Sequence, residues 1–184
     1  MIEPDEAALV SRCQNGDKEA FRMLVEKHQR LLFCTAYLMV RDRGLAEDAL
    51  QEALVKIWRN LPALRLQSSL KAWLLRILVN EVKQQFRKRR VPTLPLEKAV
   101  ELAGDPDETG MAIVRQEEYQ FLRQALTMLP ADQKETVVLR YYSGLTVPEI
   151  AVVMGQREGT IKSRLSRALD RLGDILRCED EGRR

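Results

Sequence analysis

Aromatic residues, glycine and proline are scarce in this sequence of 184 residues. Phenylalanine, tryptophan and tyrosine together make up 5% of it, and it holds only 9 glycines and 7 prolines. A β-sandwich or β-barrel is normally richer in aromatic, β-branched and turn residues, so the composition favours an all-α protein. Hydrophobic residues (45%) and charged residues (31%) are both abundant, which is typical of a soluble globular chain and excludes wholesale disorder.

Long apolar runs are missing as well. The longest stretch without a charged residue is residues 31–40, which is ten residues long, whereas a membrane-spanning helix needs roughly 20. The first residues, MIEPDEAALV, are acidic and lack the basic start of a secretory signal. We therefore expect no membrane insertion and a cytoplasmic location.

Residues that carry metal or covalent chemistry are few. Cys13, Cys34 and Cys178 lie far apart and form no CxxC pair, so we expect reduced thiols that pack or lie on the surface. The single histidine, His28, cannot form a zinc cluster, and we expect it on the surface of a helix rather than in catalysis. No nucleophile with a base, metal site or phosphate-binding loop is evident. We therefore expect no enzyme activity, no cofactor and no small-molecule substrate.

Hydrophobic periodicity and turn signals divide the chain into two helical parts. Residues 92–114 contain three prolines, two glycines and several acids, which predicts a flexible linker. The sequence thus predicts two small all-helical domains, residues 1–91 and 115–184, joined by that linker. Helices are expected over residues 6–14, 18–40, 45–60 and 70–90, and then over 115–128, 131–142, 147–154 and 158–177, with a short one near 96–103.

The two halves of the chain differ in charge. Residues 1–91 carry 17 basic and 11 acidic residues, a net charge of +6, whereas residues 92–184 carry 13 and 16, a net charge of −3. Such asymmetry is a hint of nucleic-acid binding. It directs attention to helices on which the cations share one face.

Residues 146–172 have the pattern of a helix-turn-helix. Thr146 and Glu149 form a capping box around Pro148, and Gly155 suits the end of the first helix. That first helix is expected to bury Ile150, Ala151 and Met154. The next helix is expected to bury Ile161, Leu165, Ala168, Leu172 and Ile175, which recur at three- and four-residue steps.

The other side of this second helix carries the polar groups that read DNA. At ~100° per residue, three arginines and two hydroxyls share one exposed stripe, with Lys162 beside it for backbone contact. Guanidinium groups suit guanine edges and phosphates, so the stripe predicts a recognition helix for the major groove. A plain solvated helix with scattered arginines is the alternative. The residues expected to contact duplex DNA are Arg157, Thr160, Lys162, Ser163, Arg164, Arg167 and Arg171.

The helix over residues 70–90 is also two-sided and ends in the basic run KQQFRKRR. Its core side is expected to hold Leu75, Leu78, Val79, Val82 and Phe86. Cations, amides and Trp73 lie on the other side, which suits phosphates, base edges and stacking on an unpaired base. The alternatives are a solvated helix end and, for Trp73, a place in the core. The residues expected to contact DNA here, with the preceding polar loop, are Arg65, Ser68, Lys71, Trp73, Arg76, Asn80, Lys83, Gln84, Arg87 and Lys88.

Three stretches of the sequence resemble the bacterial RNA polymerase sigma factors of the extracytoplasmic-function (ECF, group IV) type. They are AEDALQEALVKIWRNL (residues 46–61), KAWLLRILVNEVKQQFRKRR (71–90) and the segment 129–172, within which GTIKSRLSRA is the most specific. The resemblance covers nearly the whole chain. It implies sigma region two at residues 1–91, a linker, and region four at 115–184.

This resemblance implies a function and a set of partners. The chain would bind core RNA polymerase, through the β′ clamp helices and the β flap, and direct promoter-specific initiation. Asp48, Gln51 and Glu52 match the polar positions of the family's polymerase-binding motif. The basic helix would melt and capture the minus-ten promoter element, with Asn80 at a position associated with the flipped-out base, and the second domain would read the minus-thirty-five element. An anti-sigma factor is a further expected partner.

Two other functions remain open at the level of sequence. An ordinary two-domain transcription regulator could carry a similar helix-turn-helix, but it would not need the polar set at 48–52 or a second DNA surface. A sigma mimic that sequesters an anti-sigma factor could discard its basic faces, whereas this sequence keeps both.

Overall fold

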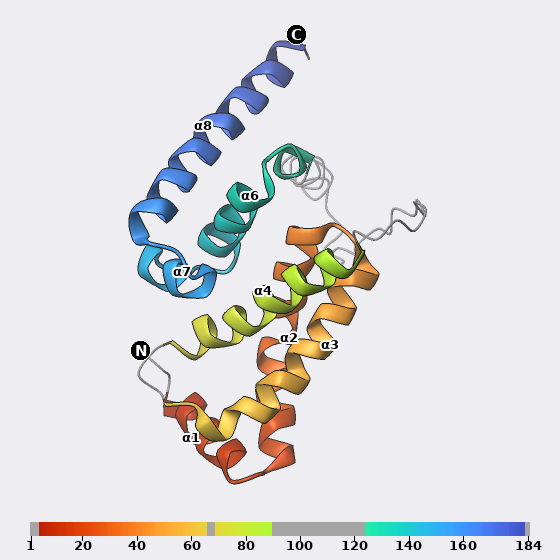
Figure 1. Cartoon of the computed structure of the whole chain (residues 1–184), viewed down its shortest axis with the longest axis vertical. Coiled ribbons are helices and arrows are strands. Elements are labelled where there is room, and N and C mark those ends of the chain that lie inside the picture. The colour runs from red at the N-terminus through yellow and green to blue at the C-terminus, as the bar shows by residue number, and fades with distance from the viewer. Residues whose placement is uncertain (1–3, 66–68, 90–123, 183–184) are drawn as a thin grey trace, which may run out of the picture.

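The computed structural model describes residues 4–65, 69–89 and 124–182, and within them all regular structure is helical (Figure 1). The all-α prediction and the division into two helical modules are thereby confirmed. The linker 92–114, the expected helix near 96–103 and most of the expected helix 115–128 lie outside the described residues. Among the described helices, none is long and apolar enough to cross a membrane.

In the described residues, the first module has four α-helices and a short 3-10 turn, and aspartate caps set the starts of the second and third helices. Asp17 accepts hydrogen bonds from the backbone N–H groups of Glu19 and Ala20, and Asp42 accepts one from Leu45. The third helix therefore starts two residues earlier than expected. The elements are α1 (Pro4–Gln14), α2 (Lys18–Val40), α3 (Arg43–Asn60), η1 (Leu61–Ala63) and α4 (Leu70–Arg89).

Small residues let α3 lie close to its neighbours α2 and α4. On α3, Ala49 and Ala53 are fully buried and Ile57 is 1% exposed. The core side of α4 supplies the larger leucines that fill the space, among them Leu75 and Leu78, which are fully buried. The seam between α3 and α4 is thus closely packed, and it fixes the polar residues that border it.

The second module is built from α6 (Ala131–Val137), the π-helical turn η2 (Val138–Tyr142), α7 (Val147–Met154) and α8 (Glu158–Gly182). The expected helix over 131–142 is present, but its last five residues widen into the π-turn. Ser143 and Leu145 then donate hydrogen bonds back to the carbonyls of Val138 and Leu139, which closes the chain toward α7. In Figure 1, α6 and α7 lie between α8 and α4.

Three burial predictions were wrong. His28 is 8% exposed, because it lies on the same side of α2 as Leu24 and Leu32 and faces Glu6 of α1. Phe86 is 46% exposed, since it lies one turn beyond Val82, the last buried residue of α4.

On α7 the third buried residue is Val153, whereas Met154 is only partly buried. On α8, Ile161, Leu165, Ala168 and Leu172 are buried as predicted, and Ile175 is partly buried. On α4, α7 and α8 the helical faces were therefore assigned correctly except near the helix ends, where the covering neighbours run out; His28, in the middle of α2, is the one error away from an end.

Candidate nucleic-acid and polymerase interfaces

The polar residues expected to bind polymerase lie together on α3. Asp48, Gln51 and Glu52 are all exposed, and their spacing of three and four residues puts them on one side of the helix. Glu47, one position earlier, instead receives a 2.8 Å hydrogen bond from Arg43 Nε. Glu47 thus takes part in a surface ion pair, although its side chain is still 45% exposed, and Asp48, Gln51 and Glu52 form the exposed set that the sequence predicts for a partner.

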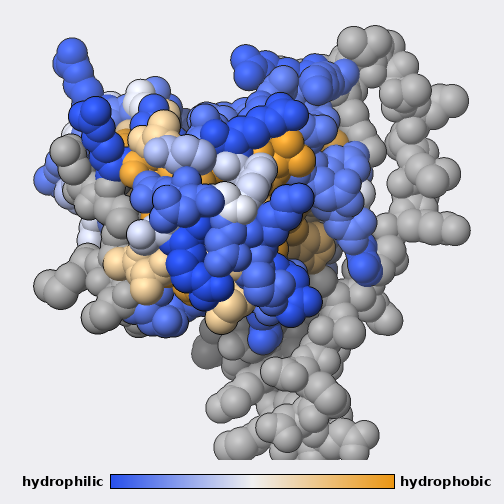
Figure 2. All heavy atoms as spheres, turned by 90° about the horizontal axis from the view of Figure 1, so that it is seen from below, coloured by the Kyte–Doolittle hydropathy of each residue, from blue (hydrophilic) through white to orange (hydrophobic). Residues whose placement is uncertain are grey.

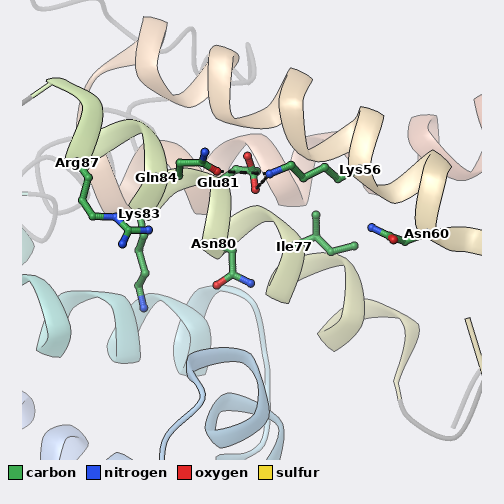
Figure 3. Close-up of a pocket in the computed structure, with 8 residues that line it drawn as sticks. All are labelled: Lys56, Asn60, Ile77, Asn80, Glu81, Lys83, Gln84 and Arg87. Carbon is green, nitrogen blue, oxygen red and sulfur yellow. Dashed lines mark hydrogen bonds and ion pairs between the residues drawn. The ribbon is translucent and has the colours of Figure 1, made fainter.

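A groove of about 420 Å³ runs between α3 and α4 (Figure 3). Four of the residues predicted to contact the minus-ten element line it, and the α3 side adds Lys56 and Asn60, which sequence reasoning missed. Its walls combine ammonium, guanidinium and amide groups, which can bind phosphates and base edges. The lining residues are Lys56, Asn60, Ile77, Asn80, Glu81, Lys83, Gln84 and Arg87.

An ion pair joins the two walls of this groove. Lys56 Nζ of α3 donates to Glu81 Oε1 of α4 at 2.6 Å and lies 3.4 Å from Gln84 Oε1 (Figure 3). Glu81 is only 4% exposed, whereas the Lys56 side chain is 40% exposed. The sequence indicates this pair only through Glu81, whose place beside the apolar Leu78 and Val82 predicts a buried carboxylate that needs a partner. The partner, Lys56, lies 25 residues away in the sequence and could not be identified from it.

The residues predicted for the minus-ten element, those in the groove included, differ in exposure. Arg65, Arg76, Asn80, Arg87 and Lys88 are exposed, and Lys71, Lys83 and Gln84 are partly buried. Trp73 packs partly buried against the core, which supports the core interpretation over base stacking. Ser68 lies outside the described residues.

The helix-turn-helix has the capping geometry that the sequence predicts. The backbone N–H of Thr146 donates to Glu149 Oε2 at 2.8 Å, and Thr146 Oγ1 accepts from the backbone N–H of Glu149. Gly155 ends α7 with φ +62°, in the left-handed region that favours glycine. After this turn α8 packs against α7 through its apolar side, which leaves the opposite, polar side of α8 free.

The predicted DNA-reading side of α8 is largely open. Arg157, Lys162, Ser163, Arg167 and Arg171 are exposed, and Thr160 is partly exposed. Arg167 Nε donates to the Ser163 carbonyl oxygen at 3.2 Å, which holds the guanidinium along the helix.

Arg164 differs from its neighbours on the stripe. Its side chain is only 21% exposed, because its Nε lies 3.1 Å from Asp132 Oδ2 of α6. The predicted exposed stripe therefore holds for Arg167 and Arg171, whereas Arg164 is only partly exposed. Arg164 ties α8 to α6, and only part of its guanidinium faces outward.

Apolar side chains do not define a large binding surface on the face shown in Figure 2. That face is mostly hydrophilic, with hydrophobic residues in separate patches. Exposed large hydrophobic residues occur on both modules, among them Val55 and Phe86 on the first and Met128, Tyr141 and Val152 on the second. Charged and polar groups are thus the stronger indication of function in this molecule.

Comparison with protein families identifies both modules. Residues 24–91 match the model of Sigma-70 region 2, and residues 120–172 match that of Sigma-70, region 4. Together these models cover more than half of the chain.

Known proteins resemble the chain over nearly its whole length. The ECF RNA polymerase sigma factor SigM of Mycobacterium tuberculosis is 34% identical over 175 residues, covering 95% of this chain and 86% of that protein. The RNA polymerase sigma-H factor of Pseudomonas aeruginosa is 33% identical over 185 residues, covering 96% of each.

Solved structures share the fold. The sigma factor RpoE in complex with the anti-sigma factor NepR from Bartonella quintana is 31% identical and covers 85% of this chain and 96% of that chain, with a TM-score of 0.70. CnrH in complex with the cytosolic domain of CnrY is 24% identical, with a TM-score of 0.71 over 95% of this chain and 98% of that chain.

The protein belongs to the ECF sigma factors of bacterial RNA polymerase. It is an alternative sigma factor, a transcription initiation factor that acts with RNA polymerase to direct transcription from specific promoters. The match to region two as well as region four sets it apart from a regulator that carries only a similar helix-turn-helix.

Proposed function

We propose a division of labour among three surfaces of this sigma factor. Asp48, Gln51 and Glu52 on α3 contact core polymerase, the groove between α3 and α4 captures the melted minus-ten element, and α8 reads the minus-thirty-five element. The observation that carries the proposal is the placement of two basic surfaces, one on each module, with the exposed polar set of α3 near the first. Residues 1–91 act as region two and residues 115–184 as region four, joined by 92–114.

The groove suits single-stranded DNA because cations and amides border it, and the contacts among Lys56, Glu81 and Gln84 hold part of its wall in place. Lys83 and Arg87 would bind phosphates, with the strong salt dependence that counterion release produces. Asn80 is exposed at the groove and would hydrogen-bond a base turned out of the duplex, as its match to the family's motif implies. Capture of an unpaired base stabilises melted DNA and offsets the cost of unstacking.

On α8, Arg167 and Arg171 would contact base edges and phosphates of the major groove, supported by Thr160 and Ser163. Arg157 and Lys162 would hold the backbone. Arg164 would contribute through the part of its guanidinium that Asp132 leaves free. Since both modules are tethered on polymerase, neither needs to bind DNA tightly alone.

The partners follow from this arrangement. Polymerase supplies the chemistry of RNA synthesis, and the chain itself acts as a specificity factor rather than an enzyme, in the cytoplasm where polymerase works. The resemblance to a sigma factor that binds an anti-sigma factor supports such a partner here as well.

Replacement of Asp48 tests the polymerase-binding surface. We expect Asp48→Ala to weaken binding to purified core polymerase about fivefold, because a charged contact is worth roughly 1 kcal/mol or more. Affinity is measured by fluorescence anisotropy with labelled sigma factor. The control Glu26→Ala removes an exposed carboxylate from α2 and leaves the affinity unchanged. Equal affinity of Asp48→Ala and the parent would contradict the assignment.

A further inference from the structure

An ion pair between α6 and α8 lies beside the proposed DNA-reading side of α8. Helix α6 packs along α8 (Figure 1), and Arg164 Nε of α8 lies 3.1 Å from Oδ2 of Asp132, which is in the first turn of α6. The two side chains are 21% and 50% exposed. The pair is therefore neither a core contact nor a free surface pair, and part of each side chain remains open to a ligand.

The position of Arg164 around α8 does not explain why it is partly buried. Arg171 follows it by seven residues, which is about two turns, and so lies on nearly the same side of the helix. Arg171 is exposed, whereas Arg164 is only partly exposed. The difference is that α6 begins beside Arg164, with the Asp132 carboxylate next to its guanidinium. A residue of another helix thus fixes the place of this arginine.

The ion pair restrains the guanidinium before DNA arrives. A free arginine side chain has many rotamers and loses this freedom when it binds a base edge. Arg164 has already lost part of it to Asp132. Guanine is recognised by two N–H groups in a fixed fork, and with Oδ2 next to Nε, the two Nη atoms at the end of the guanidinium can supply that fork. The restraint therefore favours one direction of hydrogen bonding.

The carboxylate also changes what Arg164 is suited to bind. Attraction to phosphates depends on charge, and the negative charge of Asp132 offsets that of the guanidinium at short range. The N–H groups of the guanidinium remain donors, and base edges are recognised by hydrogen bonds. An arginine paired in this way is better suited to a base edge than to the DNA backbone.

Arg167, the next arginine of the stripe, is held differently. Its Nε donates to the Ser163 carbonyl oxygen and its Nη2 donates to Ser163 Oγ, both at 3.2 Å. These partners are neutral, so Arg167 keeps its full charge and suits phosphates as well as base edges. Arg164 and Arg167 are therefore not interchangeable, although their spacing puts both on the same stripe.

We propose that Asp132 is a positioning residue for promoter recognition: it holds the Arg164 guanidinium toward a single base pair of the minus-thirty-five element and offsets its charge, so that Arg164 reads a base instead of binding phosphate. This inference rests on the proposed role of α8 in reading that element. The base pair contains guanine, whose O6 and N7 accept from an arginine fork. Asp132 itself acts through Arg164 and needs no contact with DNA.

Transcription by holoenzyme from a promoter library tests the proposal. Core polymerase is combined with each full-length variant, and the library randomises the minus-thirty-five element of a promoter that the parent chain uses. The readout is the ratio of transcripts from promoters that differ at one base pair. A smaller folded fraction or weaker polymerase binding reduces all transcripts together and leaves this ratio unchanged, so a merely structural role of Asp132 would not move it.

We expect Arg164→Ala to reduce the preference for guanine at one position about tenfold, as loss of a bidentate base contact does. Asp132→Ala should reduce the preference at the same position about threefold, because Arg164 is then present but unrestrained. Asp132→Asn keeps an acceptor oxygen beside Arg164 and should retain more of the preference than Asp132→Ala. In the Arg164→Ala background, Asp132→Ala should have no further effect on the ratio.

Asp170→Ala is the matched control, since it removes another exposed carboxylate, from α8 itself, with the same change in net charge. It should leave the preference at that position unchanged. Equal ratios for Asp132→Ala and the parent, or an equal effect of Asp170→Ala, would overturn the proposal. An effect of Asp132→Ala that persists in the Arg164→Ala background would overturn it too, by showing that Asp132 contacts DNA directly. A parent holoenzyme with no preference anywhere in the minus-thirty-five element would instead contradict the proposed function of α8.

Discussion

Lys56 is the group whose removal most directly tests the α3–α4 groove. Its ammonium is the partner of the buried Glu81 carboxylate at 2.6 Å. Lys56→Met keeps most of the length of the side chain but leaves the Glu81 carboxylate buried without its ammonium partner. A hydrogen bond between charged groups contributes about 1.5–3 kcal/mol. Because the Lys56 side chain is 40% exposed, water can reach Glu81 in the variant and compensates for part of the lost hydrogen bond. We therefore expect the free energy of unfolding to fall by about 2 kcal/mol.

Urea denaturation followed by circular dichroism measures this loss. With a slope of about 2 kcal/mol per molar urea, the midpoint should fall by about 1 M. The double variant Lys56→Met with Glu81→Leu removes the buried charge as well, so it should recover at least half of the lost stability. A midpoint for Lys56→Met within about 0.2 M of the parent would refute the reasoning, since a shift of that size is much smaller than the expected shift of about 1 M. Additive losses in the double variant would refute it too.

Two further predictions concern His28 and Arg167. Burial lowers the pKa of His28, and the charge of Glu6 opposes this only in part, with Lys27 and Lys71 also nearby. As the pH falls, the histidine of the unfolded chain therefore takes up a proton before that of the folded chain. The free energy of unfolding should then fall as the pH drops below about 6.5, by at most about 1.4 kcal/mol per pH unit. In His28→Leu the free energy of unfolding, measured by urea titration at several pH values, should depend less on pH. An unchanged slope against pH would contradict this prediction. Arg167→Ala should reduce transcription from promoters that depend on the minus-thirty-five element about tenfold, as loss of one base contact does, and unchanged promoter choice would show that the stripe is misassigned.

The positions of the helices could be predicted because their signals are local. Capping residues such as Thr146, the glycine at 155 and the apolar steps of α8 act within one or two turns, and the structure has these features where the sequence places them. The burial of His28 was also available in principle, since it occupies an apolar position of α2 between Leu24 and Leu32.

The features that could not be predicted depend on contacts between distant segments. Lys56 meets Glu81 because α3 and α4 pack closely, and Arg164 meets Asp132 because α8 folds back on α6. No periodicity within one helix reports such pairs. The same holds for the Thr35–Ser143 contact, whose members are 108 residues apart.

Run-off transcription with purified bacterial core polymerase tests the central claim most directly. A library of promoter fragments is transcribed with and without the protein, and the transcripts are sequenced. If the chain directs initiation, a defined set of promoters with shared minus-ten and minus-thirty-five elements gives transcripts only when it is present. A sigma mimic would bind an anti-sigma factor but produce no such transcripts. The absence of promoter-specific transcripts, from a chain that also fails to bind polymerase, would contradict the account.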